Sequence, residues 1–281
     1  MTVSGQVSAA IERPPAIPKP WTGARILGVA LLLLWALLGV GLIVYLVGAW
    51  NPELFDRTFP AYMRGLWVTV KLVAVSMVLG SLLAIPIAWA RMSKNRIASA
   101  LAYGYVYFFR GTPLLAQTFL VYYGLGEYFA SIRPTLQELG LWNFLRDAWP
   151  YAVLAFTLNT AAYQAEILRG AIESVPRGQW EGATSLGLSR CVTLRKVILP
   201  QAMIVALRPY ANELVLMIKG SAIVALITIF DLMGETRRAY SRSFDFQTYL
   251  WAAIIYLALV ETLRHLVDWI ERRITRHLFR H

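Results

Sequence analysis

Two uncharged apolar runs constrain this chain more than any other feature of its sequence. Residues 26–50 carry no charged side chain over 25 positions, and residues 72–90 carry none over 19. A helix of about 20 apolar residues crosses the hydrocarbon core of a bilayer, which is about 30 Å thick. A cleaved signal peptide is the alternative for the first run, but its apolar region is only about 7–15 residues long. We therefore expect a membrane protein that retains the first run as a span.

Composition supports the same class. The 281 residues are 58% hydrophobic and 15% charged, with a mean hydropathy of +0.53. These values predict one polytopic, all-α membrane domain. The net charge of +11 fits either nucleic-acid binding or a membrane protein with a basic cytoplasmic face. The single cysteine, Cys191, excludes an internal disulfide, and together with three histidines near the C-terminus it cannot supply a metal cluster.

Six membrane spans are expected from the distribution of apolar residues. They cover about 26–50, 62–91, 97–126, 149–171, 209–233 and 248–270. Residues 1–25 are rich in proline and are expected to be disordered, since they have no core to bury. Residues 127–147 should form an amphipathic loop, and residues 235–247 a polar one.

Two local patterns refine these spans. In the second span, small residues recur every four positions and so share one helix face; they are Ser76, Gly80, Ala84 and Ala88. Small residues at this spacing let the backbones of two membrane helices approach closely. The third span is interrupted by the polar segment 110–113, which reads RGTP. Such a break is tolerated only where it is buried in protein or lines a cavity.

The basic residues predict the orientation of the spans. Most of the 27 Lys and Arg lie in the first 25 residues and in segments 91–96, 169–208 and 264–281. Lys and Arg concentrate in cytoplasmic loops, so all four segments should be cytoplasmic, together with both termini. The basic excess then needs no nucleic acid to explain it.

The cytoplasmic segment 172–207 is long and ordered in its spacing. Pro176 and Gly178 should end the fourth span, and residues 179–188 and 193–199 can each form a short helix. Gly187 is a natural stop for the first helix, and Pro200 is expected to turn the chain back to the bilayer. A rigid knob of this kind, with Glu181 at its tip, can transmit movement from a soluble partner. The alternative is an amphipathic helix lying passively on lipid headgroups.

This segment reads EGATSLG and, nine residues later, VILP. It resembles the EAA motif of the permease subunits of type I ABC importers, with consensus EAA-x3-G-x9-I-x-LP. Gly182 and Val197 stand where Ala and Ile are usual. Segments 107–125, 158–183 and 197–202 resemble the polar amino acid permeases, closest to the histidine, basic amino acid and opine branch. The resemblance covers about 60–275, and the span at 26–50 looks like an extra N-terminal helix added to a five-helix core.

The resemblance implies a set of partners and a docking surface. In this family the loop inserts a coupling helix into a cleft of the ATP-binding subunit. The residues implied in that contact and in the loop's return are Glu181, Gly182, Ala183, Gly187, Leu199 and Pro200. The implied partners are a dimer of ATP-binding cassette subunits, a second identical or homologous permease, a periplasmic amino acid-binding protein, the amino acid substrate and the lipid bilayer. No nucleic acid is implied, and the location is a bacterial inner membrane.

No cofactor and no catalysis are expected of this chain itself. It lacks the G-x4-G-K-[ST] phosphate loop, so ATP and Mg should be used by the partner ATPase subunit.

Polar residues within the spans mark a candidate substrate pathway. An ionisable side chain at the centre of a bilayer costs about 2.5–3.5 kcal/mol on insertion scales, so it usually faces a cavity or a partner. The candidates are Arg110, Thr112, Asn159, Tyr163, Glu166, Glu213, Lys219 and Ser221. A carboxylate among them would suit a cationic side chain such as arginine or histidine. Structural ion pairs, Arg110 with Glu166 or Glu213 with Lys219, are the alternative, although the latter two lie about 240° apart on one helix.

Many members of the family read Lys-Asp-Thr-Ser where this chain reads Lys-Gly-Ser-Ala at 219–222, so the resemblance does not settle the substrate.

Two other functions compete with an importer subunit. An ion-coupled secondary amino acid transporter would use Glu166 or Glu213 as a proton relay and need no ATPase. An intramembrane enzyme lacks support, because the sequence offers no Ser/His, Cys/His or metal-binding His pair.

Overall fold

The computed structural model describes residues 22–48 and 50–275, and these residues form helices and connecting turns, with no β-strand among them. Most of the tail predicted to be disordered, up to residue 21, lies outside the described residues. The chain divides into two units, Met1–Asn51 and Pro52–His281.

The described residues of the first unit form one helix, α1 (Gly23–Gly48), of 26 residues. It carries apolar side chains on all sides and buries none of them against protein. A helix that is apolar around its whole circumference suits a lipid environment.

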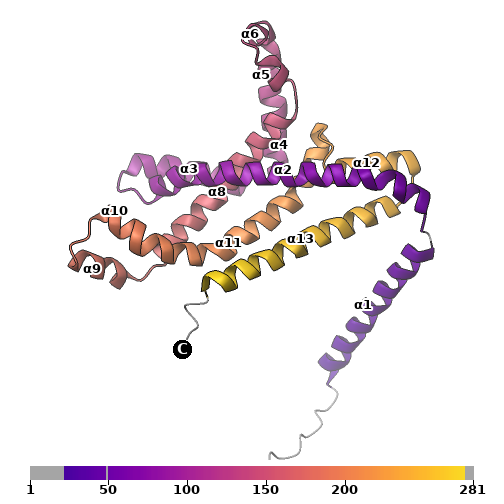
Figure 1. The fold of residues 1–281 in the computed structure, drawn as a ribbon, viewed down its shortest axis with the longest axis horizontal. Helices are drawn as coiled ribbons and strands as arrows, with labels where there is room; N and C mark the ends of the chain where they lie inside the picture. Colours follow the sequence, from indigo (N-terminus) through magenta and orange to yellow (C-terminus); the bar gives the residue numbers. More distant parts are fainter. Residues whose placement is uncertain (1–21, 49, 276–281) are drawn as a thin grey trace, which may run out of the picture. The chain divides into compact units, whose positions relative to one another are not determined.

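In the second unit, α2 (Pro52–Arg91) packs along α8 (Trp149–Glu173) (Figure 1). The small-residue stripe predicted in the second span forms this contact: all four of its residues are buried. A Cβ atom on Gly80 would lie 2.4 Å from Cγ2 of Thr160. The helices therefore touch nearly backbone to backbone. The helix ends where the predicted span ends but starts ten residues earlier, at Pro52.

The third predicted span is broken where expected. Helix α3 (Arg96–Gly111) stops before Thr112 and Pro113, and α4 (Leu114–Phe119) resumes and continues as a π-helical turn over Leu120–Leu125. Three short helices follow in the predicted loop: α5 (Gly126–Ser131), α6 (Arg133–Glu138) and α7 (Trp142–Leu145). Figure 1 shows α4, α5 and α6 forming an arm that rises across the direction of α2.

The segment predicted to be cytoplasmic, 172–207, departs from prediction in its second half. Helix α9 (Arg177–Ser185) is followed by a turn. After the turn, α10 (Arg190–Thr193), a π-helical turn over Leu194–Ile198 and α11 (Leu199–Gly220) form one uninterrupted helical run. The predicted separate helix at 193–199 and the turn at Pro200 are therefore wrong. Pro200 lies in the first turn of α11, where proline is tolerated, and the π turn before it accommodates the ring. The predicted loop 172–207 thus overlaps α8 at its start and α11 at its end.

The bounds predicted for the fifth span, 209–233, are also wrong. Helix α11 begins ten residues earlier and passes into a 3₁₀ segment, Ser221–Ile227, which ends at Thr228 with a left-handed backbone (φ 69°). The predicted polar loop at 235–247 is mostly helix α12 (Leu232–Ser243), which Asp231 caps by accepting a hydrogen bond from the Gly234 N–H (2.8 Å). The last helix, α13 (Gln247–Ile274), contains the sixth predicted span.

Four helical runs in the described part of the chain are long and apolar enough to cross a membrane: α1, α2, the run Arg190–Ile227 and α13. The third predicted span does not count among them because it is broken, and α8 does not because its polar side chains lower its hydropathy. Six crossings therefore remain an inference from charge and connectivity.

Two apolar clusters position the functional residues. The larger one joins α2, α8, α11 and α13 through residues such as Leu72, Phe156 and Met217. The other, called here the root cluster, lies at the base of the segment predicted to be cytoplasmic. Its buried members are Ala171, Ile172, Val175, Ile198, Ala202 and Ala206. The root cluster fixes the end of α8 to the start of α11.

Candidate functional site

The predicted knob, which consists of α9 and the turn that follows it, is a defined structure rather than a tether. Helix α9 ends in a turn in which the Gly187 N–H donates to the Thr184 carbonyl (2.9 Å) and the Leu188 N–H donates to the Ala183 carbonyl (3.1 Å). This is the Schellman pattern, which requires a left-handed residue after the helix. Gly187 supplies it with φ +71°, as the sequence predicted. The turn fixes the angle at which the chain leaves α9.

One side of α9 faces the membrane domain and the other faces outward. Ala183 is buried, and Trp180 packs against the root cluster. Glu181 and Gly182 are exposed, and Leu186 is 79% exposed at the tip. Leu186 was absent from the predicted contact set, although an apolar residue just before a helix-ending glycine is a readable signal. The outward face thus combines the carboxylate of Glu181, the backbone at Gly182, which no side chain covers, and the apolar side chain of Leu186.

The break in the third span is stabilised by two amide side chains. Gln117 Nε2 donates to the carbonyl oxygens of Phe109 (2.9 Å) and Thr112 (3.0 Å) and to Thr112 Oγ1 (2.7 Å). Asn159 Nδ2 donates to the Phe109 carbonyl (3.1 Å) and to Gln117 Oε1 (2.9 Å). Carbonyls left free by the missing helical turn are therefore satisfied from within the protein. The structure places Thr112 and Asn159 at this break, together with Gln117, which sequence reasoning missed.

Glu213 lies at the end of a buried polar chain that crosses three helices. Its side chain is 5% exposed and its Oε1 accepts a hydrogen bond from Thr160 Oγ1 (2.9 Å). Gln164 Nε2 donates to the same Thr160 oxygen (3.0 Å), and Ser81 Oγ donates to Gln164 Oε1 (2.5 Å). The chain links α2, α8 and α11 at the depth where α2 and α8 are closest.

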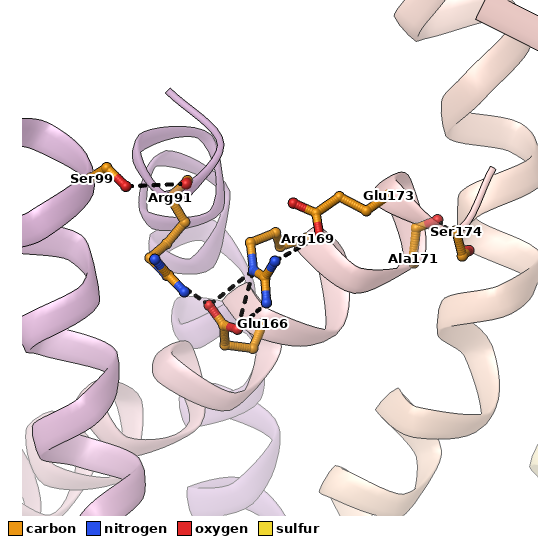
Figure 2. A network of polar contacts seen from close by, with 7 residues as sticks. All are labelled: Arg91, Ser99, Glu166, Arg169, Ala171, Glu173 and Ser174. Atoms are coloured by element: carbon orange, nitrogen blue, oxygen red, sulfur yellow. Dashed lines mark hydrogen bonds and ion pairs between the residues drawn. The ribbon is translucent and has the colours of Figure 1, made fainter. Parts of the chain in front are cut away.

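A hollow of about 380 Å³ lies between α8, α11 and the end of α3. Arg110, Tyr163 and Glu166 border it, and the Arg110 guanidinium lies over the Tyr163 ring, 5.2 Å from its centre. The possible pair between Arg110 and Glu166 is not formed. Glu166 instead pairs with Arg91 (2.9 Å) and Arg169 (2.7 Å) (Figure 2). Sequence reasoning missed Arg91, because it read this residue as one of the topology-setting charges of a loop.

Lys219 lies elsewhere, in a groove of about 890 Å³ between α11 and α13. Asn212, seven residues earlier, lines the same groove, so both side chains share one face of α11. Lys219 is not paired with Glu213, in agreement with their angular separation. Ser221 is buried and donates to the Ile218 carbonyl (2.8 Å). The predicted pathway residues therefore divide among the helix break, the hollow, the buried chain and the groove, except for Ser221, which lies in none of them.

Among the described residues, no group of three or more His, Cys, Asp or Glu side chains is placed to hold a metal ion.

Comparisons with known proteins give consistent results. A family model described as "Binding-protein-dependent transport system inner membrane component" matches residues 76–276. The nopaline transport system permease protein NocM of Agrobacterium fabrum is 39% identical over 227 residues, which cover 80% of this chain and 92% of that protein. The arginine ABC transporter permease protein ArtM of Escherichia coli K12 is 37% identical over 215 residues, which cover 76% and 94%. The crystal structure of an amino acid ABC transporter with histidines aligns with a TM-score of 0.69 at 33% identity, covering 80% of this chain and 99% of that one.

Proposed function

Because this chain belongs to the binding-protein-dependent transport system inner membrane components, we propose that it is the permease subunit of an ATP-driven importer of basic amino acids or opines. The observation that carries the substrate class is its similarity, over most of its length, to permeases named for nopaline and arginine. Uptake of labelled histidine, arginine, glutamine and octopine by the reconstituted complex tests it. Uptake of glutamine alone would exclude the proposed substrate class.

We propose a topology with six crossings and both termini in the cytoplasm of a bacterium's inner membrane. Residues 26–50 would form an extra N-terminal span, and residues 60–275 the permease domain. The basic segments support this orientation. The lone cysteine offers a direct test, since Cys191 is exposed beside the knob. A membrane-impermeant maleimide should label it in inside-out vesicles and not in right-side-out vesicles, and the reverse result would invert the topology.

We propose that the knob docks on a separate ATPase subunit, which binds ATP and Mg. Glu181, Gly182 and Gly187 would form the contact, and Ala183 would hold α9 against the root cluster. Leu199 and Pro200 would begin the rigid return along α11. Since the root cluster joins α9 to α8 and α11, displacing the knob would move both helices. Glu181→Ala and Gly187→Asp should reduce ATP-driven uptake, and unchanged uptake would remove the knob from the mechanism.

We propose that the substrate meets Glu213, Arg110 and Tyr163 on its way between α8 and α11, and Lys219 in the neighbouring groove. Alternating access of a pair of permeases, identical or homologous, would expose these residues first to a periplasmic amino acid-binding protein and then to the cytoplasm. Glu213 is the carboxylate suited to a cationic side chain, because Glu166 is already neutralised by two arginines.

A secondary transporter using Glu213 as a proton relay is the competing function. It predicts uptake driven by a proton gradient in vesicles that contain this chain alone. The importer predicts no such uptake until the ATPase, the binding protein and ATP are present.

A further inference from the structure

We propose that Arg91 is a positioning residue that holds α2 and α3 to α8 through Glu166, so that movement of the knob reaches α2. The proposal rests on the function proposed above and adds a residue to it. The root cluster explains how the knob moves α8 and α11. It does not by itself explain how α2, the longest helix of the second unit, follows them.

The contacts of Arg91 join three helices at one point. Arg91 is the last residue of α2, and its Nε donates to Glu166 Oε1 on α8 at 2.9 Å. Its guanidinium lies over the ring of Tyr103 on α3, 4.9 Å from the ring centre. Its carbonyl oxygen accepts a hydrogen bond from Ser99 Oγ at 3.3 Å (Figure 2). The side chain is therefore held from both sides, and its direction is set.

Glu166 passes the connection on toward the knob. Its second oxygen accepts from Arg169 Nη2 (2.7 Å), one turn further along α8, and Arg169 Nη1 donates to Glu173 (2.6 Å). Glu173 is the last residue of α8, four residues before α9 begins. Figure 2 shows this chain of charges running from the end of α2 along α8. Next to Arg91, Met92 packs against the root cluster. The end of α2 is thus attached to the base of the knob by charge and by apolar contact.

Burial separates this pair from ordinary surface ion pairs. The side chains of Arg91 and Glu166 are only 17% and 13% exposed. In the other described ion pair between helices, Arg208 is 78% exposed. Exposed pairs contribute little because water screens them, whereas a covered guanidinium and carboxylate are costly to separate. The Arg91–Glu166 pair therefore favours joint movement of α2 and α8 over sliding of one past the other.

The test uses the complete importer in liposomes, with the ATPase and the binding protein, and arginine as the labelled substrate. The measured quantity is the number of ATP molecules hydrolysed per arginine imported. Arg91→Gln keeps a hydrogen-bond donor of similar length but removes the charge. We expect it to assemble with the ATPase and to raise this ratio by at least about fivefold, the lower limit of typical coupling between sites. Arg91→Lys, which keeps the charge but lacks the planar guanidinium that lies over Tyr103, should fall between wild type and Arg91→Gln.

A charge exchange separates positioning from folding. Arg91→Glu and Glu166→Arg should each uncouple hydrolysis from uptake. The double variant should recover part of the coupling, because the pair between α2 and α8 is rebuilt with reversed polarity while the bond from residue 166 to Arg169 is not. Arg96→Gln is the matched control: Arg96 is the first residue of α3, directly after the turn that follows Arg91, is exposed and forms none of the ion pairs found among the described residues. It should leave the ratio unchanged.

Three results would overturn the proposal. One is a proportional fall of hydrolysis and uptake in Arg91→Gln, since this leaves the ratio unchanged and indicates only fewer working complexes. Another is a double variant as uncoupled as the single ones. The third is an effect of Arg96→Gln equal to that of Arg91→Gln. These results can be told apart from a failure of the proposed function, because in that case the wild-type complex would itself show no ATP-dependent uptake of arginine.

Discussion

Gly80 marks the closest approach of α2 and α8, and replacing it with alanine should loosen that contact. The added Cβ would lie 2.4 Å from Thr160 Cγ2, 3.3 Å from Gln164 Nε2 and 3.4 Å from the Ala161 nitrogen. Ordinary contacts begin near 3.4 Å, so the Thr160 methyl must retreat by about 1 Å. It cannot simply rotate, because Thr160 Oγ1 is held by Glu213 and Gln164.

Two opposing contributions set the expected magnitude. Overpacking of this kind destabilises by about 1–3 kcal/mol. Alanine in place of a mid-helix glycine stabilises by about 0.5–1 kcal/mol. The variant Gly104→Ala in α3 measures the stabilising contribution alone, since a Cβ at this position meets nothing within 4 Å. Gly80→Ala should therefore be less stable than Gly104→Ala by about 1–3 kcal/mol. At about 2–4 °C per kcal/mol, the melting temperatures should differ by roughly 2–12 °C.

The assay is thermal unfolding of the detergent-solubilised permease, followed by tryptophan fluorescence. The rescue variant is Thr160→Ser, which removes the obstructing methyl but keeps the hydroxyl that bonds Glu213. Gly80→Ala combined with Thr160→Ser should recover most of the loss. If Gly80→Ala melts no lower than Gly104→Ala, or if Thr160→Ser gives no recovery, the two helices are not packed as closely as described.

Three further predictions follow from the same contacts. Gln117→Leu leaves the Thr112 carbonyl without its side-chain donor and removes the Gln117 Oε1 acceptor of Asn159, whereas the Phe109 carbonyl keeps its bond from Asn159. It should therefore destabilise the permease by about 1–3 kcal/mol for each unsatisfied group, measured by thermal unfolding; a variant as stable as wild type would show that water or neighbours suffice. Gly187→Ala forces a left-handed alanine, which costs about 1–2 kcal/mol, so it should weaken capture of the ATPase subunit and lower the permease's melting temperature by roughly 2–8 °C; equal capture would contradict it. Glu213→Gln should raise the KM for arginine at least about tenfold and change that for glutamine little, and equal effects on both substrates would remove charge recognition from this residue.

Sequence patterns predicted the contacts that depend on local chemistry. The small-residue stripe of the second span, the RGTP break and the stop at Gly187 each follow from what a few side chains permit, and the structure has all three. The helix ends around Pro200 and Met233 were predicted wrongly. A proline reads as a boundary, yet the π turn before Pro200 lets the helix run through it, and a π turn has no sequence signature of its own.

Partners far apart in the sequence could not be predicted. Glu166 lies 75 residues from Arg91, and many charges of the correct sign were available to it. Arg110, the partner considered from sequence, lies over Tyr163 instead. Gln117 was overlooked because its side chain donates to carbonyl groups that the break in the helix leaves free. Which carbonyls these are depends on the three-dimensional path of the backbone at the break, which the sequence does not show.

The uninterrupted helical run from Arg190 to Ile227 limits how this protein can vary. Adding or removing one residue between Arg190 and Pro209 would rotate everything beyond it by about 100°. Glu213 would then leave Thr160, and the face that bears Lys219 would turn out of its groove. Length changes near this run in homologous chains should therefore be confined to the turn at 186–189, before the run begins, where an added residue leaves the register of α11 unchanged.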